Sequence, residues 1–552
     1  MQTKKYLLIA ILIIAAYLRL WNLGSIPPSL TPDEASLGYN AYSILKTGRD
    51  EYGKLLPIIF KSFGDYKPGL YIYLTVPSVA VFGLTEFATR LPSALAGILI
   101  VYLIYLIVRS LFTDHLPRRV KAGRSLATIA TFVAATNPWL IYFSRGAWEV
   151  NVALALTLAG IYFFLRSLRN SSFIIHSSVA FGATLLAYQG AKLSTGIVVL
   201  LLVALYFKRV IKINLKKLII AVVLGVLISF PILLSFIKGQ TGRLTVFSIF
   251  SYHDSKEYLQ KADYYFFHSE PLFFARGILG RYFNHFSGRF LFFEGDWSNP
   301  RHSAPNSGMF LLSDLIILLL GLIFIFRNHT LYTKPYTLIL LWLLLAPLPS
   351  ILSRDQVHAV RSINMVIPLI IIISIGLDNL VIWIKDQKFS GAFYVLLTTF
   401  YMLSFAYFVD SYFIHLPKHN SKLWGYGHKE MVQKVTEIQT QYKTIKIQQS
   451  FLQPYIYFLF YQKYDPAKYQ KQAKWSESEY KDDVGYVTKL DNIDFVGRID
   501  WQISRGESGV LFVAGPSQIP PEDSKDEKLF KVISEIKYLD GKEIAFRIVE
   551  VL

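Results

Sequence analysis

The sequence predicts a polytopic α-helical membrane protein, and three observations support that fold class. Hydrophobic residues make up 53% of the 552 positions, and they gather in long runs such as "YLLIAILIIAAYL", "LSDLIILLLGLIFIF" and "INMVIPLIIIISIGL". With their flanks, such runs are long enough to span or nearly span a bilayer core. Basic residues cluster between the runs, where they determine topology. The chain has no cysteine, which excludes disulfides, thiolate zinc sites and cysteine nucleophiles.

The net charge of +19 could suggest a nucleic-acid partner, but the basic residues lie largely between the apolar runs. We therefore expect no nucleic-acid partner and assign the charge to membrane topology. The first apolar run is predicted to remain as a span, because no small-residue cleavage pattern follows it and Arg19-Leu20-Trp21 continues the segment.

The basic clusters predict which runs cross the membrane. If every cluster lies in the cytoplasm, the runs between them must cross in pairs. This pairing holds only if "GLYIYLTVPSVAVFG" (69–83) does not cross the membrane. Its length of about fifteen residues and its internal Pro77 are expected of a re-entrant or interfacial segment. The clusters are Lys4-Lys5, 109–124, 166–170, 208–217, 327–334 and 385–388.

This pairing predicts about eleven spans in a cell (inner) membrane, with the N-terminus in the cytoplasm. The spans are expected near 5–20, 91–111, 125–143, 150–168, 172–187, 192–207, 218–237, 308–326, 335–352, 361–384 and 391–410. The external side then receives residues 21–90, a loop at 238–307 and the tail at 411–552.

The tail changes in character at about residue 427. Helix-like "HKEMVQKVTEIQTQY" and "PYIYFLFYQKY" alternate there with strand-like "KTIKIQQSF", "GVLFVAG" and "KEIAFRIVEV". Such alternation is typical of a small α/β domain. We therefore expect a transmembrane domain at 1–410, a linker at 411–426 and an external α/β domain at 427–552.

The stretch "SLTPDEASLGYNAYSIL" begins soon after the first span and carries two adjacent carboxylates, Asp33 and Glu34. Thr31 is the expected N-cap of a helix, Pro32 its first residue, and Glu34 the partner in a capping box. Asp33 then lies in the first turn, where the electropositive helix N-terminus favours the ionised carboxylate. The local pattern predicts a helix start and leaves open whether these carboxylates also take part in chemistry.

Several motifs follow the Asp-Glu pair along the chain. They are "FGDYKPGLYIYL", "EFATRLPSALAG", "NPWLIYFSRGAWEVNVAL", "AYQGAKLS", "DWSNPRHSAPNSG" and "SRDQVHAVRSINMVIPLIIIISIGL". In this order they resemble the bacterial family 39-like transferases, which are GT-C glycosyltransferases and include the protein O-mannosyltransferases and the lipid A aminoarabinose transferase. The resemblance covers about residues 5–410 and implies a GT-C membrane fold.

The resemblance also implies an activity. Such enzymes pass a sugar from a polyprenyl-phosphate donor to an acceptor hydroxyl of a protein, lipid or polysaccharide on the outer face. Because the leaving group is a phosphate, the chemistry needs a carboxylate for the incoming hydroxyl and cations for the phosphate, and no strong general acid. The family's Asp-Glu pair implies Asp33 as the base, and its Lys-Pro position implies Lys67 as a phosphate ligand. Glu34 is either a second active carboxylate or a capping residue alone, and Lys67 could instead be an interfacial lysine.

The turn "SRGAWEVN" carries Arg145, Glu149 and Asn151. In the family an acidic residue on this turn approaches the first-loop carboxylate, but the family's later Asp is absent here and only Glu149 or Asn151 stands nearby. Oligosaccharyltransferase-type relatives bind a divalent ion through an Asp-x-Asp motif, which this turn lacks. The sequence leaves a divalent metal open and names no ligand for it.

The turn "RDQVHAVR" offers Arg354, His358 and Arg361 at the outer mouth of a predicted span. His358 and Arg361 are three residues apart and share a helix face. Cationic groups at that depth are costly unless paired, so the donor phosphate is a candidate partner, with anchoring near lipid headgroups as the alternative. Lys192 and the pair Arg301-His302 are weaker candidates of the same kind. Arg90 is expected to form a structural ion pair with Glu86.

Other classes of protein remain as alternatives. A transporter or flippase would have ionisable residues in the middle of its spans, whereas here the polar groups gather at one end. A receptor or scaffold would leave the acidic and basic clusters unexplained. A polysaccharide polymerase acting on lipid-linked glycans stays within glycosyl transfer and is harder to exclude.

Overall fold

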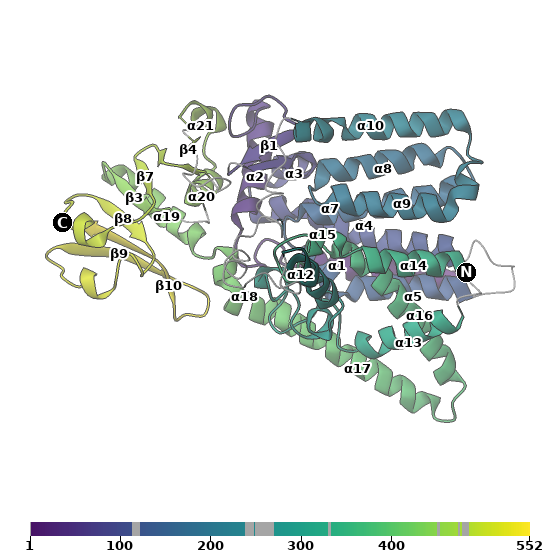
Figure 1. Ribbon diagram of the computed structural model, residues 1–552. Coiled ribbons are helices and arrows are strands. Elements are labelled where there is room, and N and C mark those ends of the chain that lie inside the picture. The colour runs from purple at the N-terminus through teal and green to yellow at the C-terminus, as the bar shows by residue number, and fades with distance from the viewer. Residues whose placement is uncertain are drawn as a thin grey trace. The chain divides into compact units, whose positions relative to one another are not determined.

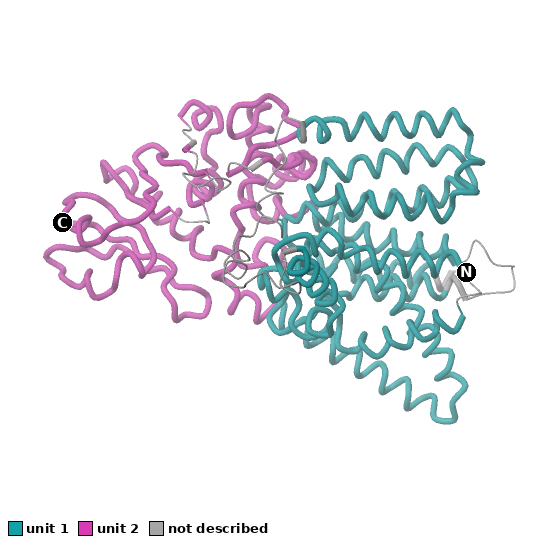
Figure 2. Tube along the Cα trace, viewed as in Figure 1, with its two compact units in different colours: residues 1–21, 93–412 teal, residues 22–92, 413–552 magenta. Residues whose placement is uncertain are grey.

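The computed structural model describes residues 2–63, 65–112, 122–237, 248, 270–328, 333–449, 453–472, 475–476 and 485–552. The chain forms two compact units, each built from two separate stretches (Figure 2). Unit 1 comprises residues 1–21 and 93–412, and unit 2 comprises residues 22–92 and 413–552. Most of the predicted loop at 238–307 before residue 270, and the middle of the basic segment at 109–124, lie outside the described residues.

The domain boundaries predicted at 410 and 427 divide the chain by the side of the membrane on which each part lies. The two compact units are defined by packing between residues, which does not test those boundaries. The division stays a prediction.

Unit 1 is a bundle of apolar helices, in which α7, α8, α9 and α10 run side by side (Figure 1). Its helices are α1 (Gln2–Leu20), α4 (Glu86–Phe112, which begins in unit 2), α5 (Ala122–Thr136), α6 (Pro138–Ser144), α7 (Glu149–Ser167), α8 (Phe173–Ala187), α9 (Ala191–Val210), α10 (Leu215–Ile237), α12 (Glu270–Asn284), α13 (Asp314–Arg327), α14 (Thr333–Leu345), α15 (Leu348–Ile351), α16 (Val366–Lys385) and α17 (Ser390–Asp410). One-turn helices η3 (Arg289–Phe293), η4 (Pro300–His302) and η6 (Ile363–Met365) lie between them, and η7 (Ser411–His415) follows α17.

Among the described residues, seven helices are long and apolar enough to cross a membrane, or eight if the bent pair α5 and α6 counts as one span. The protein is therefore a polytopic helical membrane protein. The predicted runs at 5–20, 172–187 and 308–326 form helices that do not meet this measure, so the number eleven stays a prediction. The 56° bend between α5 and α6 falls at Asn137-Pro138, where the proline cannot donate a helical hydrogen bond.

Glycines let two helices of unit 1 pack backbone against backbone. A side-chain carbon at Gly321 of α13 would collide with the carbonyl of Ile372 on α16, and one at Gly376 of α16 would collide with the carbonyl of Ile317 on α13. Small residues at helix contacts allow this approach in apolar surroundings.

Unit 2 combines the first inter-span segment with the C-terminal stretch. The first segment contains α2 (Pro32–Thr47), the hairpin β1 (Ile59–Ser62) and β2 (Asp65–Pro68), and α3 (Leu70–Phe82). With 13 residues, α3 is about 20 Å long, which is too short to cross a core of about 30 Å. Like the helices at 173–187 and 314–327, it does not meet the measure for a span, so the absence of a crossing at 69–83 stays a prediction.

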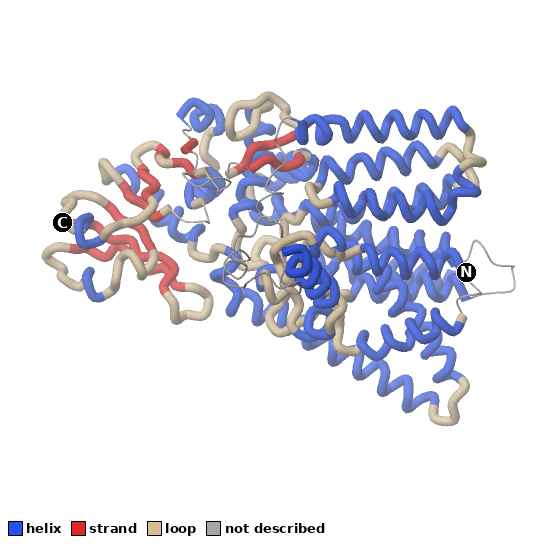
Figure 3. The backbone as a smooth tube through the Cα atoms, viewed as in Figure 1, coloured by secondary structure: helices blue, strands red, loops and turns tan. Residues whose placement is uncertain are grey.

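The C-terminal stretch is a mixed α/β structure (Figure 3). Its sheet has the strand order β6-β7-β3-β8-β10-β9, in which β3 is parallel to β7 and β8 and the other pairs are antiparallel. Its elements are α18 (Leu416–Asn420), η8 (Ser421–Trp424), α19 (His428–Ile438), η9 (Gln439–Gln441), β3 (Ile445–Gln448), α20 (Pro454–Tyr461), α21 (Pro466–Gln472), β4 (Trp475–Ser476), β5 (Tyr486–Val487), β6 (Lys489–Leu490), β7 (Ile493–Val496), α22 (Trp501–Ser504), β8 (Leu511–Ala514), η10 (Glu522–Ser524), β9 (Phe530–Lys537) and β10 (Ile544–Val551).

The two stretches of unit 2 share one core. The α-carbon of Gly38 on α2 lies so close to Phe460 of α20 that a side-chain carbon there would meet the ring at 2.6 Å. The hydroxyl of Tyr39 donates to the carbonyl of Tyr464 at 3.2 Å, and the hydroxyl of Tyr457 donates to the carbonyl of Leu30 at 3.1 Å. The C-terminal stretch therefore fixes the position of α2.

Candidate active site

The first turn of α2 is built as the sequence predicts. The backbone N–H of Thr31 donates to Glu34 Oε2 at 2.9 Å, and the backbone N–H of Glu34 donates to Thr31 Oγ1 at 3.3 Å. With Pro32 at the first helical position, this confirms the capping box. The geometry directs the side chain of Glu34 inward and leaves that of Asp33 beside it in the same turn.

Glu34 is buried and holds Arg90, and the expected ion pair between Arg90 and Glu86 is wrong. Arg90 Nε donates to Glu34 Oε1 at 2.9 Å, and the guanidinium also donates to the carbonyls of Leu23 and Pro27. Glu86 instead accepts from Lys429 Nζ at 2.8 Å. The physical reason is burial. Arg90 is fully buried, so its charge needs a buried carboxylate and carbonyls, whereas Glu86 can use a half-exposed lysine.

Asp33 remains accessible at the start of α2. Its side chain is 53% exposed, and its Oδ1 accepts a hydrogen bond from Lys67 Nζ, whose side chain is 14% exposed. Lys67 lies on β2 with its ammonium 5.5 Å from the centre of the Phe63 ring. The ammonium and the helix N-terminus both favour the carboxylate form of Asp33.

Unit 1 contains a cavity of about 300 Å³, here called the arginine cavity. It brings together residues from the short turns that the sequence singles out, including Glu149, Tyr188 and the "RDQVHAVR" segment. Its lining is Trp148, Glu149, Val150, Tyr188, Asn299, Arg301, His302, Arg354, Asp355, His358, Val360 and Arg361. The predicted candidates Glu149, Arg354, His358 and Arg361 thus share one cavity with the weaker candidates Arg301 and His302.

The electrostatics of the arginine cavity favour an anion. Three guanidinium groups and two carboxylates line it. Arg361 donates to Asp355 Oδ2 at 3.1 Å, and Arg301 lies over the Trp148 ring at 5.9 Å. Burial lowers the pKa of His302 and, more strongly, of His358, and the nearby Arg301 and Arg361 lower both further, so both imidazoles are neutral at pH 7. The fixed positive charge is therefore carried by the arginines.

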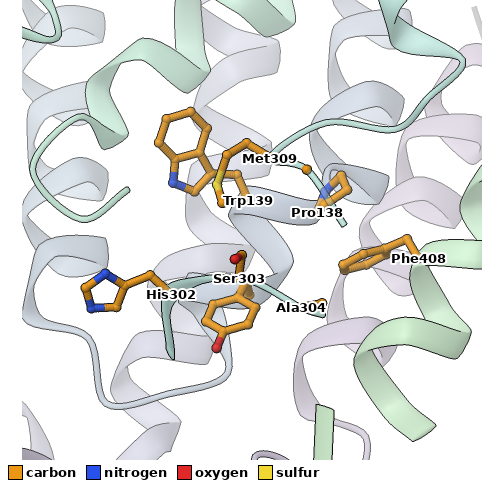
Figure 4. A pocket seen from close by; sticks show the side chains of 9 residues that line it. Pro138, Trp139, His302, Ser303, Ala304, Met309 and Phe408 are labelled. Carbon is orange, nitrogen blue, oxygen red and sulfur yellow. The ribbon is translucent and has the colours of Figure 1, made fainter. Parts of the chain in front are cut away.

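His302 and His358 of the cavity lining form a buried cluster with Asp296, here called the His–Asp cluster. His302 Nδ1 lies 3.0 Å from Asp296 Oδ2, and the rings of His302 and His358 have centres 5.0 Å apart. His302 also lines a second pocket of about 10 Å³, opposite Phe408 (Figure 4). That volume holds about one water molecule.

Of the predicted site residues in unit 1, three do not line the arginine cavity. Arg145 is fully buried, donates to the carbonyl of Leu18 at 2.9 Å and lies over the ring of Tyr412. Asn151 is also buried and donates to the carbonyl of Ser93 at 2.8 Å. Lys192 is half-buried in the first turn of α9. The contacts of Arg145 and Asn151 join helices of unit 1.

Several residues of these sites are missed by the sequence interpretation. Asp355 and Trp148 lie inside the quoted motifs. Their positions next to the candidates Arg354 and Glu149 could have indicated that they belong to the same site. Asp296 opens the quoted segment "DWSNPRHSAPNSG", but nothing local predicts that it meets His358. Glu51 of unit 2 is fully buried and accepts from Asn40 Nδ2 at 3.0 Å, and its sequence surroundings carry no sign of this.

Comparison with known proteins bears on the fold. No protein-family model matches the sequence, and no curated protein matches it. Among solved structures, the chain is similar to ArnT from Cupriavidus metallidurans in the apo state, with 12% identity, a TM-score of 0.55, and coverage of 98% of this chain and 97% of that chain. The fold is that of the GT-C glycosyltransferases.

The same ArnT bound to undecaprenyl phosphate aligns with a TM-score of 0.53, 12% identity, and coverage of 98% and 97%. The archaeal oligosaccharyltransferase AglB from Archaeoglobus fulgidus aligns over 83% of this chain and 63% of that chain with 11% identity and a TM-score of 0.49. The likeness to ArnT extends over the whole fold. It confirms the GT-C architecture expected from the motifs.

Proposed function

We propose that this chain is a membrane glycosyltransferase that moves a monosaccharide, such as a mannose-type hexose, from a polyprenyl-phosphate donor to an acceptor hydroxyl of a protein, lipid or polysaccharide. The acceptor side is the outer face of the cell membrane, with the N-terminus in the cytoplasm, as the basic loops favour. The GT-C fold, shared with a protein that has been seen with undecaprenyl phosphate, supports this class of donor.

The arginine cavity is the observation that carries the proposal. A polyprenyl-phosphate sugar is a phosphodiester with one negative charge, and the departing polyprenyl phosphate carries two. Negative charge therefore grows on the phosphate as the sugar leaves. Fixed guanidinium groups, such as Arg301 and Arg361, stabilise that growing charge more than they stabilise the ground state. Asp355 keeps Arg361 oriented through its hydrogen bond.

Asp33 supplies the base. Its half-exposed carboxylate takes the proton of the acceptor hydroxyl as the hydroxyl oxygen attacks the anomeric carbon of the sugar. The bond between that carbon and the phosphate oxygen breaks, and the polyprenyl phosphate leaves with the electron pair, which inverts the configuration at the sugar. Lys67 donates a hydrogen bond to Asp33 and is a second candidate ligand for the phosphate.

Glu34 is a positioning residue in this proposal. Both of its carboxylate oxygens accept hydrogen bonds, from Arg90 and from the backbone of Thr31, so its task is to fix the turn that presents Asp33.

The test is sugar transfer from labelled polyprenyl-phosphate sugars in membranes that contain equal amounts of wild type or Asp33→Asn. We expect Asp33→Asn to lower the rate by about 10²–10⁴-fold, because general base catalysis is typically worth that much. Its melting temperature should stay close to wild type, since the capping box uses Thr31 and Glu34 instead.

Glu86→Gln is the matched control, since it removes another carboxylate of the first inter-span segment and should change the rate only a few-fold. A wild type that is inactive with every donor tested would contradict the donor class. Equal rates for wild type and Asp33→Asn would show that Asp33 serves only in the helix start.

A further inference from the structure

The His–Asp cluster joins three ligating side chains from distant parts of unit 1. Asp296 follows η3, His302 ends η4, and His358 lies between α15 and η6. One ligating atom from each lies within 4.8 Å of the others, and all three residues are buried, with exposed fractions of 0%, 5% and 8%. We propose that Asp296, His302 and His358 form a three-ligand site for a divalent transition metal, with zinc as the ion that best fits the donor set.

The chemistry of the three donors supports zinc. Zinc binds imidazole nitrogen at about 2.0–2.1 Å and carboxylate oxygen at about 2.0–2.2 Å, and two His with one carboxylate is a common ligand set of catalytic zinc. Such bonds place tetrahedral ligand atoms about 3.4 Å apart. The three atoms here are close enough to reach that spacing by small side-chain rotations.

The surroundings hold the donors in place. Asp296 Oδ2 accepts from the backbone N–H of Ala359 at 2.7 Å, and its Oδ1 accepts from that of Asn299 at 2.9 Å. The His302 ring packs edge-to-face on Trp148 with ring centres 5.5 Å apart. Hydrogen bonds and packing of this kind orient the ligands of protein metal sites.

A plain hydrogen bond between His302 and Asp296 explains only part of the cluster. It leaves His358 without a reason to be buried against the other two residues among arginines. The polar contacts of the His358 ring are long, with the backbone N of Arg361 at 3.4 Å from Nδ1 and Asp355 Oδ2 at 3.9 Å from Nε2. A ring whose polar contacts are this long can turn to coordinate a cation.

The charges nearby act in both directions. Arg301 and Arg361 oppose a cation, whereas Asp296 supplies a carboxylate ligand and Asp355 accepts a hydrogen bond from Arg361. His302 and His358 also line the arginine cavity, so a fourth coordination position would open toward it. With the ion bound there, it would withdraw charge from a phosphate oxygen in the cavity. That role rests on the proposed function, whereas the metal site rests on the geometry of the cluster.

The test measures metal on the full-length protein in detergent. The protein is stripped with a chelator, equilibrated with micromolar zinc, freed of loose ions, and analysed for zinc per chain by mass spectrometry. We expect one zinc per chain in wild type and a loss of at least tenfold in His358→Gln and in Asp296→Asn. His176→Gln is the matched control, since it removes an exposed histidine of the same unit and should retain one zinc.

Cobalt gives a second readout. Cobalt bound to the same residues should show the visible absorption of a low-coordinate ion, and we expect His358→Gln to abolish that absorption. Zinc that is absent from wild type, or equal in wild type and His358→Gln, would overturn the site. Asp296→Asn replaces one of the two oxygens that accept backbone hydrogen bonds with an amide nitrogen that cannot accept, so a failure of that variant to fold leaves His358→Gln as the deciding variant.

Sugar transfer on the same samples separates the two proposals. If Asp33→Asn abolishes transfer while wild type retains no zinc, the proposed function stands and the metal site falls. If zinc binds one per chain and stripping it leaves transfer unchanged, the site stands and its part in phosphate departure falls.

Discussion

Glu51 is a single carboxyl group that the fold of unit 2 buries completely. Desolvation raises its pKa from the ordinary value of 4.5 to about 8. Between these two pH values the folded protein keeps a proton on Glu51 that the unfolded chain releases. The free energy of unfolding therefore falls as the pH rises from about 4.5 to about 8, by roughly 3–5 kcal/mol from this group.

The prediction is that Glu51→Gln weakens this pH dependence. The amide keeps the shape of the protonated carboxyl and cannot ionise, so the variant should melt higher than wild type at pH 8 and much like it at pH 5. Melting temperatures across this range check the prediction. Glu437→Gln, which alters an exposed side chain, should keep the wild-type slope. A Glu51→Gln slope equal to wild type would show that the carboxyl is already charged in the fold.

Arg361 provides a prediction on binding. Removing one charged ligand of a phosphate typically costs about 1.5–3 kcal/mol, so Arg361→Gln should raise KM for the donor or lower kcat/KM by about 10- to 100-fold. KM for the acceptor should change little. Arg169→Gln, at an exposed arginine of the same unit, should leave both values near wild type. An effect confined to the acceptor would contradict the assignment of the arginine cavity to the donor phosphate.

Contacts between elements decide how α13 and α16 pack. Gly321→Ala or Gly376→Ala would press a methyl group onto the facing backbone, and overpacking of this kind typically costs about 1–3 kcal/mol. Each variant should melt several degrees lower than wild type. Gly196→Ala on α9 is the control, because no atom lies within 4 Å of the added carbon and alanine favours the helix by about 0.5–1 kcal/mol. A lowered melting temperature in Gly196→Ala alone would contradict the close packing of α13 and α16.

Most helices and strands could be predicted from the sequence, because the patterns that indicate them are local. The capping box at Thr31 and Glu34, the helix at α19 and the strands β3, β8 and β10 lie where periodicity and turn residues place them. The exposed position of Asp33 follows from the same turn.

The contacts that complete the sites are long-range, and local patterns do not contain them. Arg90 bonds Glu34, 56 residues away, in preference to Glu86 four residues away, because burial selects the partner. The segment that carries His358 is joined to Asp296 by the backbone N–H of Ala359, which donates to the Asp296 carboxylate 63 residues away. The burial of Glu51 depends likewise on how whole segments pack.

The composition of unit 2 has consequences for the whole molecule. The C-terminal stretch supplies Phe460 and the partners of Tyr39 and Leu30, so removing residues 427–552 strips the core that supports α2. We expect the truncated chain to lose sugar transfer with every acceptor and to become sensitive to protease within residues 22–92. Full-length Lys422→Gln, which removes an exposed ion pair with Glu543 and a contact with the Tyr538 ring, should resist protease like wild type. A truncated chain with intact transfer would contradict this account of the core.

Membrane topology can be tested directly, because the natural chain has no cysteine. A single cysteine at Lys212→Cys, between α9 and α10, should be shielded from an impermeant maleimide in intact cells, whereas one at Lys525→Cys should react. Permeabilised cells, in which both positions should react, provide the control. The reverse pattern would invert the predicted orientation.

The division of unit 2 into two stretches also sets a delay during synthesis. Residues 22–92 emerge first, then the roughly 320 residues of 93–412, and only afterwards the stretch that contains α20. At about 5–20 residues per second, this order leaves the earlier half of the unit without its partner for on the order of 15–60 s. Throughout that interval the nascent α2 presents to its surroundings the face that Phe460 later covers, so the newborn chain is most vulnerable to degradation and misassembly at the segment that carries Asp33.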